Sequence, residues 1–340
     1  MRKLLLAGLV LAIALVGVGW RTPASEAAPG DLLATVTLPA MPAGAAVGGT
    51  FDGIHYISVM TGGDTLYWMT PPPGISGAAT LAFSKPIIDD GVGNPVQISA
   101  VAWDARRTNK LWGAYGNSIY LIDISGVNAV ATLKFSPGFG GLIDGLAYDS
   151  SDDTLYYSPD MNCCAYHYSL GTDFFPNPAL GTLMNTVTPK NSLGVADGFV
   201  SGVVVGSGNT LYIGRNGAAE IRRVDKTTGA FISQFATTFG RVEDLTCDPV
   251  TYAPQEAVLA KDASNRLYEA FEVEPGTCPL PAPPGVGGTA ELVAGSDGPA
   301  SAADSAGSSA PLYAALAGFV AAAALALTGG GWYARRRWMR

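Results

Sequence analysis

The chain has 340 residues, of which 14% are charged, and it contains 43 glycines and 23 prolines with a formal net charge of −8. This weakly charged, glycine-rich composition, which also holds many aromatic and β-branched residues, favours short strands and tight turns over helices. The acidic balance excludes nucleic acid as a partner, because phosphate recognition requires clustered lysine and arginine.

The first predicted element is a secretory signal peptide over residues 1–27. A basic pair at the second and third positions precedes an apolar run that ends at Trp20, and small residues follow at Ala24 and Ala27. This order of charge, apolar run and small-residue site is typical of a signal peptide, with cleavage after either alanine. We therefore expect an exported protein, in which the four cysteines are oxidised.

Residues 28–272 carry a repeated strand pattern. Similar lines recur with equivalent positions at His55, Leu111, Leu155, Leu211 and Val258, separated by 56, 44, 56 and 47 residues. One strand is expected before each repeat line and one after it, and a fourth strand closes most of the units. Four antiparallel strands are therefore expected in each period. This is the pattern of β-propeller blades, and the fold class predicted is an all-β propeller.

The number of blades follows from the repeats. The fifth unit meets a proline-rich segment after its third strand, which leaves it without a clear fourth strand. An unassigned strand over residues 32–38 would fill that place and close the ring, removing an exposed edge. We predict five four-stranded blades closed by this N-terminal strand, with six as the alternative if a long insertion hides a strand pair.

The C-terminal part is predicted to be a stalk and a membrane anchor. Residues 273–310 are rich in Pro, Gly, Ala and Ser and cannot bury a core. Residues 311–334 form an apolar span long enough to cross a bilayer, and the arginine-rich tail over 335–340 favours the cytoplasmic side. The expected localisation is therefore the cell membrane, with the propeller outside and the C-terminus in the cytoplasm.

Two resemblances add to this interpretation. The lines from Asp144 to Tyr156 and from Val224 to Gly229 resemble repeats of secreted bacterial propellers of the NHL, YVTN and SMP-30-like group. This resemblance covers most of residues 32–272 and implies a fold more strongly than an activity. The last 30 or so residues resemble bacterial surface-sorting tails, although no LPxTG-type sequence precedes the apolar span.

The candidate ligand face is the one on which the first strand of each blade begins, since it also carries the loops between second and third strands. The residues expected there are Tyr115, Asp144, Asp160, Met161, Asp197, Ser201, Arg215, Asn216, Asp244, Lys261 and Asp262. Carboxylates round an axis would suit Ca²⁺, which takes six to eight oxygen ligands. The alternative is that these residues cap turns and face solvent.

The cysteines divide between the two faces of the expected propeller. Cys247 lies toward the end of a first strand and Cys278 follows a third strand, so both lie near the opposite face and are predicted to form a disulfide. Cys163 and Cys164 lie in a loop on the ligand face. They would form a vicinal disulfide, remain thiols or pair between molecules; a vicinal ring would either staple the loop or offer an apolar plate to a sugar or cofactor.

Catalytic motifs are missing from the sequence: it has no Ser, His and Asp constellation of recognisable spacing, no HExxH, no paired CxxC and no GxxxxGK. The sequence therefore favours a surface-anchored extracellular propeller that binds a ligand, glycan or protein partner over an enzyme. The alternative, implied by the resemblance, is a metal-dependent lactonase or lyase of the SMP-30-like type. A purely structural envelope protein is a third hypothesis.

Overall fold

A computed structural model describes residues 28–41, 46–138, 143–160, 163–171, 178–196 and 198–279. The predicted signal peptide, membrane span and basic tail, and the stalk beyond residue 279, lie outside these ranges. In the ranges described, regular structure consists of strands, and no helix is long and apolar enough to cross a membrane.

The strands form antiparallel meanders that follow one another along the chain. Their bounds are β2 (Gly49–Phe51), β3 (Tyr56–Val59), β4 (Thr65–Thr70) and β6 (Thr80–Asp89); β7 (Ala100–Trp103), β8 (Lys110–Tyr115), β9 (Ser118–Asp123) and β10 (Ala129–Phe135); β11 (Ile143–Asp149), β12 (Thr154–Pro159), β13 (Ala165–Ser169) and β14 (Leu183–Val187). They continue with β15 (Val200–Gly206), β16 (Thr210–Arg215), β17 (Glu220–Asp225) and β18 (Phe231–Ala236); then β19 (Asp244–Asp248), β20 (Glu256–Asp262) and β21 (Leu267–Val273).

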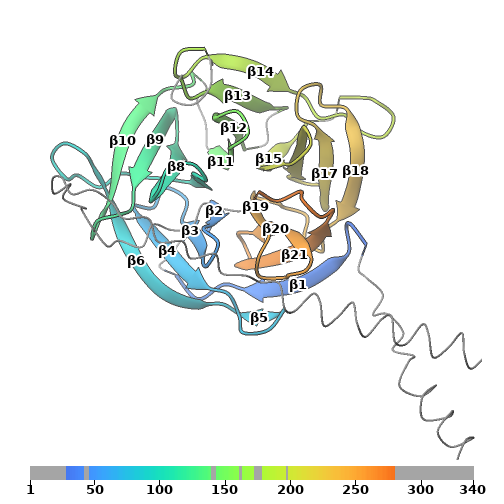
Figure 1. The fold of residues 1–340 in the computed structure, drawn as a ribbon, viewed down its shortest axis with the longest axis horizontal. Helices are drawn as coiled ribbons and strands as arrows, with labels where there is room; N and C mark the ends of the chain where they lie inside the picture. Colours follow the sequence, from blue (N-terminus) through green and yellow to red (C-terminus); the bar gives the residue numbers. More distant parts are fainter. Residues whose placement is uncertain are drawn as a thin grey trace, which may run out of the picture. The chain divides into compact units, whose positions relative to one another are not determined.

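These meanders are arranged round a central axis (Figure 1). The first strand of each meander is innermost, and β2, β7, β11, β15 and β19 contact one another in turn until β19 meets β2. Radial four-stranded sheets round a closed ring of inner strands define a β-propeller. The predicted all-β propeller is therefore confirmed as a fold.

The N-terminal strand closes the ring. β1 (Leu32–Thr37) pairs antiparallel with β21, with Val36 opposite Tyr268, as the sequence predicts. On its other edge β1 pairs with the two-residue strand β5 (Gly77–Ala78). The first and last parts of the described chain thus belong to one sheet, which leaves no gap in the ring at this point.

Aspartates and left-handed residues shape the turn between first and second strands. The Asp104 carboxylate accepts the N–H groups of Arg106 and Arg107, and Asp52 and Asp248 accept equivalent bonds in their own sheets. Two residues before four of the five repeat positions, a residue with positive φ completes the turn: Gly53, Asn109, Asp153 and Asn209. Gly, Asn and Asp tolerate this conformation best, which explains why the repeats carry them there.

Two strands begin late in their repeats because turns use the residues before them. β14 begins at Leu183, since Gly181 has a positive φ and its N–H donates to Ser169 O. β3 begins at Tyr56, one residue after the repeat position His55, because the Asp52 turn precedes it. Regular pairing starts only where the backbone hydrogen bonds are no longer committed to a turn.

The hydrophobic core lies between neighbouring sheets. Trp112 on β8 and Tyr157 on β12 belong to one cluster, and Tyr212 on β16 and Phe271 on β21 belong to another. A disulfide joins Cys247 to Cys278, with a Cα separation of 5.3 Å, as predicted. Cys278 is buried, so packed structure extends beyond residue 272, where the sequence analysis placed the end of the propeller.

We predict that Val36→Ala destabilises the protein by about 2 kcal/mol, because it removes buried methyl groups from the closing strand. Val36 is fully buried, whereas Thr35 beside it is exposed. Thr35→Ala is therefore the matched control and should change stability by less than about 0.5 kcal/mol. Urea unfolding followed by tryptophan fluorescence measures both; equal effects would contradict a role of β1 in closing the ring.

Candidate functional site

The two faces of the propeller differ in which connections they carry. The inner strands begin at what we name the upper face, and in an antiparallel meander the connection from second to third strand returns to that same face. The upper face therefore holds the starts of β11, β15 and β19 and the loops that follow β12, β16 and β20. The lower face holds the Cys247–Cys278 disulfide and the last described residue, Pro279, which lines the axial cavity together with Cys247 and Tyr148.

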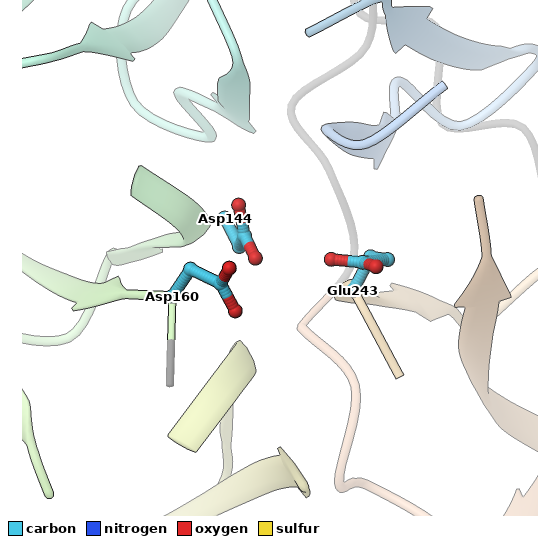
Figure 2. Close-up of side chains that lie close together, drawn as sticks. All are labelled: Asp144, Asp160 and Glu243. Atoms are coloured by element: carbon cyan, nitrogen blue, oxygen red, sulfur yellow. The ribbon is translucent and has the colours of Figure 1, made fainter. Parts of the chain in front are cut away.

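Three carboxylates meet at the axis on the upper face. Asp144 lies in β11, Asp160 directly follows β12, and Glu243 directly precedes β19. One oxygen from each lies within 4.8 Å of the others, and Figure 2 shows the Glu243 carboxylate facing Asp144 and Asp160. Asp144 and Glu243 are buried, with 3% and 2% of their surface exposed.

Irregular backbone at the inner strands brings these side chains together. The β11–β12 register shifts between Ile143 and Gly145, at Asp144, and such a bulge turns a side chain out of the regular alternation. Close packing of the inner strands also requires glycine. A Cβ on Gly145 would lie 2.7 Å from Val203 N, and one on Gly202 would lie 2.8 Å from the Asp244 carbonyl carbon.

Polar neighbours hold the cluster in place. Asn216 Nδ2 donates to Asp160 Oδ1 at 2.9 Å, and Ser201 Oγ donates to Asp144 Oδ2 at 3.2 Å. Arg241 pairs with Glu243 Oε1 and lies 3.7 Å from Asp160 Oδ2. Glu243 Oε2 is buried and has no hydrogen-bond partner in the protein.

The environment of the cluster disfavours a full negative charge on all three carboxyl groups at once. Burial, together with the Glu243 and Asp160 carboxylates, raises the pKa of Asp144 to about 9. Burial also raises the pKa of Glu243, although Arg241 opposes that rise. Burying like charges side by side costs free energy unless a proton or a cation balances them.

The donor set suits a hard divalent cation. Carboxylate oxygens bind Ca²⁺ at about 2.3–2.6 Å, so two ligands on opposite sides of one ion lie about 4.6–5.2 Å apart. The separations in the cluster fall within that limit. The unpartnered Glu243 Oε2 is the kind of buried acceptor that an ion would satisfy. Asp144, Asp160 and Glu243 therefore fit a cation such as Ca²⁺, with coordination positions left for other oxygen ligands.

Asp244 and Lys261, both expected on the ligand face, lie opposite each other in the β19–β20 pair and are buried. Asp244 Oδ2 accepts Gly49 N at 2.7 Å, while Lys261 Nζ donates to Gly48 O at 2.6 Å and to Ser58 Oγ. Burial lowers the pKa of Lys261 to about 7, against the attraction of Asp244. These contacts fasten the last sheet to the first.

The remaining expected residues lie apart from the cluster. Asp262 caps the turn after β20 by accepting Ser264 N and Asn265 N. Arg215 pairs with Glu220 and donates to Gly198 O. Tyr115 borders a depression with Gly62 and Gln97. Met161 and Asp197 lie outside the described residues.

A vicinal disulfide occupies the loop that follows Asp160. Cys163 and Cys164 are bonded to each other, which selects one of the three states left open by the sequence. Cys163 is exposed, whereas Cys164 is buried in the cluster that contains Tyr157 and Tyr166. The disulfide thus presents one sulfur-bearing residue at the surface and anchors the other in the core.

Sequence reasoning named Asp144 and Asp160 but missed Glu243 and Arg241. The signal was available in the repeats: counting back five residues from Asp149 and Asp248, which end their first strands, gives Asp144 and Glu243. The residue predicted to face the axis, Asp244, lies one position later. Adjacent strand residues point to opposite sides, so this shift of one residue exchanged the axial side chain for one that faces Lys261.

Comparisons with known proteins show similarity of fold alone. No family model and no curated protein matches the chain. Among solved structures, glutaminyl cyclase from Myxococcus xanthus has 13% identity over 72% of this chain and 100% of its own, with a TM-score of 0.47. A luciferin-regenerating enzyme has 9% identity over 69% and 92%, with a TM-score of 0.43. The Cps50 (Swd1) β-propeller domain from Myceliophteria thermophila has 10% identity over 69% and 99%, with a TM-score of 0.42.

We predict that Lys261→Met lowers the free energy of unfolding by about 3 kcal/mol, because it leaves the Asp244 carboxyl group buried without the positive charge of the Lys261 side chain. The double variant Lys261→Met, Asp244→Asn should recover part of that loss, since it removes both charges. A double-mutant cycle by urea denaturation measures the coupling. Strictly additive effects would show that the two side chains do not act as a pair.

Proposed function

We propose that this protein is an exported, membrane-anchored β-propeller that binds an extracellular ligand at its upper face through a divalent cation. Asp144, Asp160 and Glu243 would hold the cation. The observation that carries the proposal is the buried Glu243 oxygen that has no protein partner and belongs to a carboxylate facing two others (Figure 2). A cation balances their charge, and its remaining coordination positions would accept ligand oxygens.

The ring is interpreted as five blades. One eight-stranded sheet contains both β2-β3-β4-β6 and β10-β9-β8-β7. The two halves meet through a parallel β6–β10 pairing that covers only three residue pairs, from Ala129–Ile87 to Ala131–Asp89. We take this contact as an edge between two blades, because blades are antiparallel meanders. The blade β19-β20-β21-β1 then completes the ring, and the repeats resemble those of the NHL, YVTN and SMP-30-like group.

Membrane anchorage would orient the binding face. The apolar span over residues 311–334 with its arginine-rich tail supports an anchor whose C-terminus is cytoplasmic. The described chain ends at Pro279 on the lower face, beside the Cys247–Cys278 disulfide. A stalk that starts there would leave the carboxylate cluster on the side away from the membrane, accessible to ligands from outside the cell.

The alternative activity, a metal-dependent lactonase or lyase, would use the same carboxylates, since a bound cation lowers the pKa of coordinated water. An assay of lactone hydrolysis with the purified exported domain, in the presence of Ca²⁺ or Mn²⁺, separates the two functions. Turnover that is lost in Asp144→Asn would favour the enzyme, and its absence would favour binding.

We predict that Ca²⁺ stabilises the wild-type protein, by about 2.7 kcal/mol when its concentration is a hundred times the Kd. Asp144→Asn should abolish this effect. In EDTA, however, the same variant should be at least as stable as wild type, because it replaces a buried carboxyl group that lies beside two other carboxylates with a neutral amide. Thermal unfolding with and without Ca²⁺, together with isothermal titration, measures both effects.

Asp90→Asn is the matched control, because Asp90 is an exposed aspartate outside the cluster and the chemical change is identical. It should leave the response to Ca²⁺ intact. A wild-type protein whose stability is the same in Ca²⁺, Mg²⁺ and EDTA, and which gives no heat on titration, would contradict the proposed cation site.

A further inference from the structure

Phe199 is an exposed aromatic residue in an unfavourable backbone conformation. It has a φ of 73°, in the left-handed region that bulky side chains avoid. Half of its surface is exposed, so a large part of the ring is available to a ligand. Strain retained at an exposed aromatic is a sign of a binding role, because packing alone would favour another residue.

Hydrogen bonds connect Phe199 to the carboxylate cluster. Phe199 directly precedes β15 at the upper face, and its carbonyl accepts Asn216 N at 3.0 Å. The Asn216 side chain in turn donates to Asp160, and the Asn216 backbone bridges to Arg241. The aromatic residue is therefore held beside the proposed cation ligands by a short, defined path.

The vicinal disulfide adds a second apolar surface at the same place. A Cβ on Gly198, the residue before Phe199, would lie 3.5 Å from the Cα of Cys163. Cys163 is exposed, so its half of the disulfide faces solvent near Gly198, the neighbour of Phe199 in the chain, and three residues after Asp160. Arg241, whose side chain is 52% exposed, supplies a positive charge on the same face.

These features combine an oxygen-binding cation, an apolar platform and an exposed guanidinium. A sugar ring has one apolar face that packs on aromatic rings, and its hydroxyl groups are ligands that Ca²⁺ accepts. A carboxylate on that sugar would pair with arginine, whose planar fork matches carboxylate geometry. An acidic sugar meets all three features, because the half-exposed Arg241 keeps N–H donors for a ligand carboxylate besides its pairs with Glu243 and Asp160.

We propose that the upper face binds a hexuronate unit of a saccharide. Phe199 and the Cys163–Cys164 disulfide form its apolar platform, the cation takes its hydroxyl oxygens, and Arg241 takes its carboxylate. This inference rests on the proposed function, since it needs the cation held by Asp144, Asp160 and Glu243. The feature added to that cation site is the apolar platform formed by Phe199 and the disulfide.

The test uses D-galacturonate and D-glucuronate as probes and D-galactose and D-glucose as their neutral counterparts. In Ca²⁺, the exported domain should bind a uronate at least about tenfold more tightly than its neutral counterpart, as one charge-assisted pair provides. Phe199→Gly should weaken uronate binding by about tenfold through loss of the platform. It should leave the Kd for Ca²⁺ unchanged within about twofold.

Phe199→Gly also separates a binding role from a structural one. Glycine adopts a positive φ without strain, so the melting temperature of this variant in EDTA should equal or exceed that of wild type. Phe199→Tyr keeps the ring and should retain uronate affinity. Uronate binding unaffected by Phe199→Gly, or a clear fall in its melting temperature, would overturn the inference.

The two proposals fail in different ways. Ca²⁺ binding without uronate binding overturns the saccharide inference alone and leaves the cation site in place. The absence of Ca²⁺ binding overturns both. Equal affinity for a uronate and its neutral counterpart would show that Arg241 does not recognise the carboxylate. That result would overturn the assignment to acidic sugars.

Discussion

The pairing of β1 with β21 is the contact on which the rest of the described structure depends. It completes the last sheet with the first strand of the domain, so the first and last described strands lie in one hydrogen-bonded ladder. The inner strands then form a closed circle in which β19 contacts β2. That closure, together with the contacts of Asp244 and Lys261 with the first sheet, holds β19 beside β2 and so keeps Glu243 near Asp144.

The closed ring brings its inner strands very close to one another at the centre. Inner strands approach so closely that Gly145 and Gly202 have no room for a side chain, and the bulge in β11 turns Asp144 toward the axis. The outcome is a cluster of three carboxylates, two of them buried, and charging them together opposes folding. A structural element with that cost is retained most readily where a ligand balances it, and this is the physical basis of the proposed cation site.

Stability and binding are divided between two groups of charged residues at the same face. Asp244 and Lys261 are fully enclosed and satisfied by Gly48, Gly49 and Ser58, so they hold the first and last sheets together. Asp160 and Arg241 are partly exposed and lie toward solvent. The buried pair thus supports the rim on which a ligand is proposed to bind.

The sequence by itself determined the repeat, the propeller class, the closing strand and the Cys247–Cys278 disulfide. Each follows from local rules: alternation, turn residues at fixed offsets, and the direction of the chain in a meander. Only the tertiary structure decided which charged side chains face the axis. A shift of one residue reverses the direction of a strand side chain, which separates Glu243 from Asp244, and the bulge at Asp144 depends on the neighbouring strands β12 and β15. Phe199 is hydrogen-bonded to Asn216 within one blade, but the bond from Asn216 to Asp160 joins two blades, and no spacing within a single repeat encodes that contact.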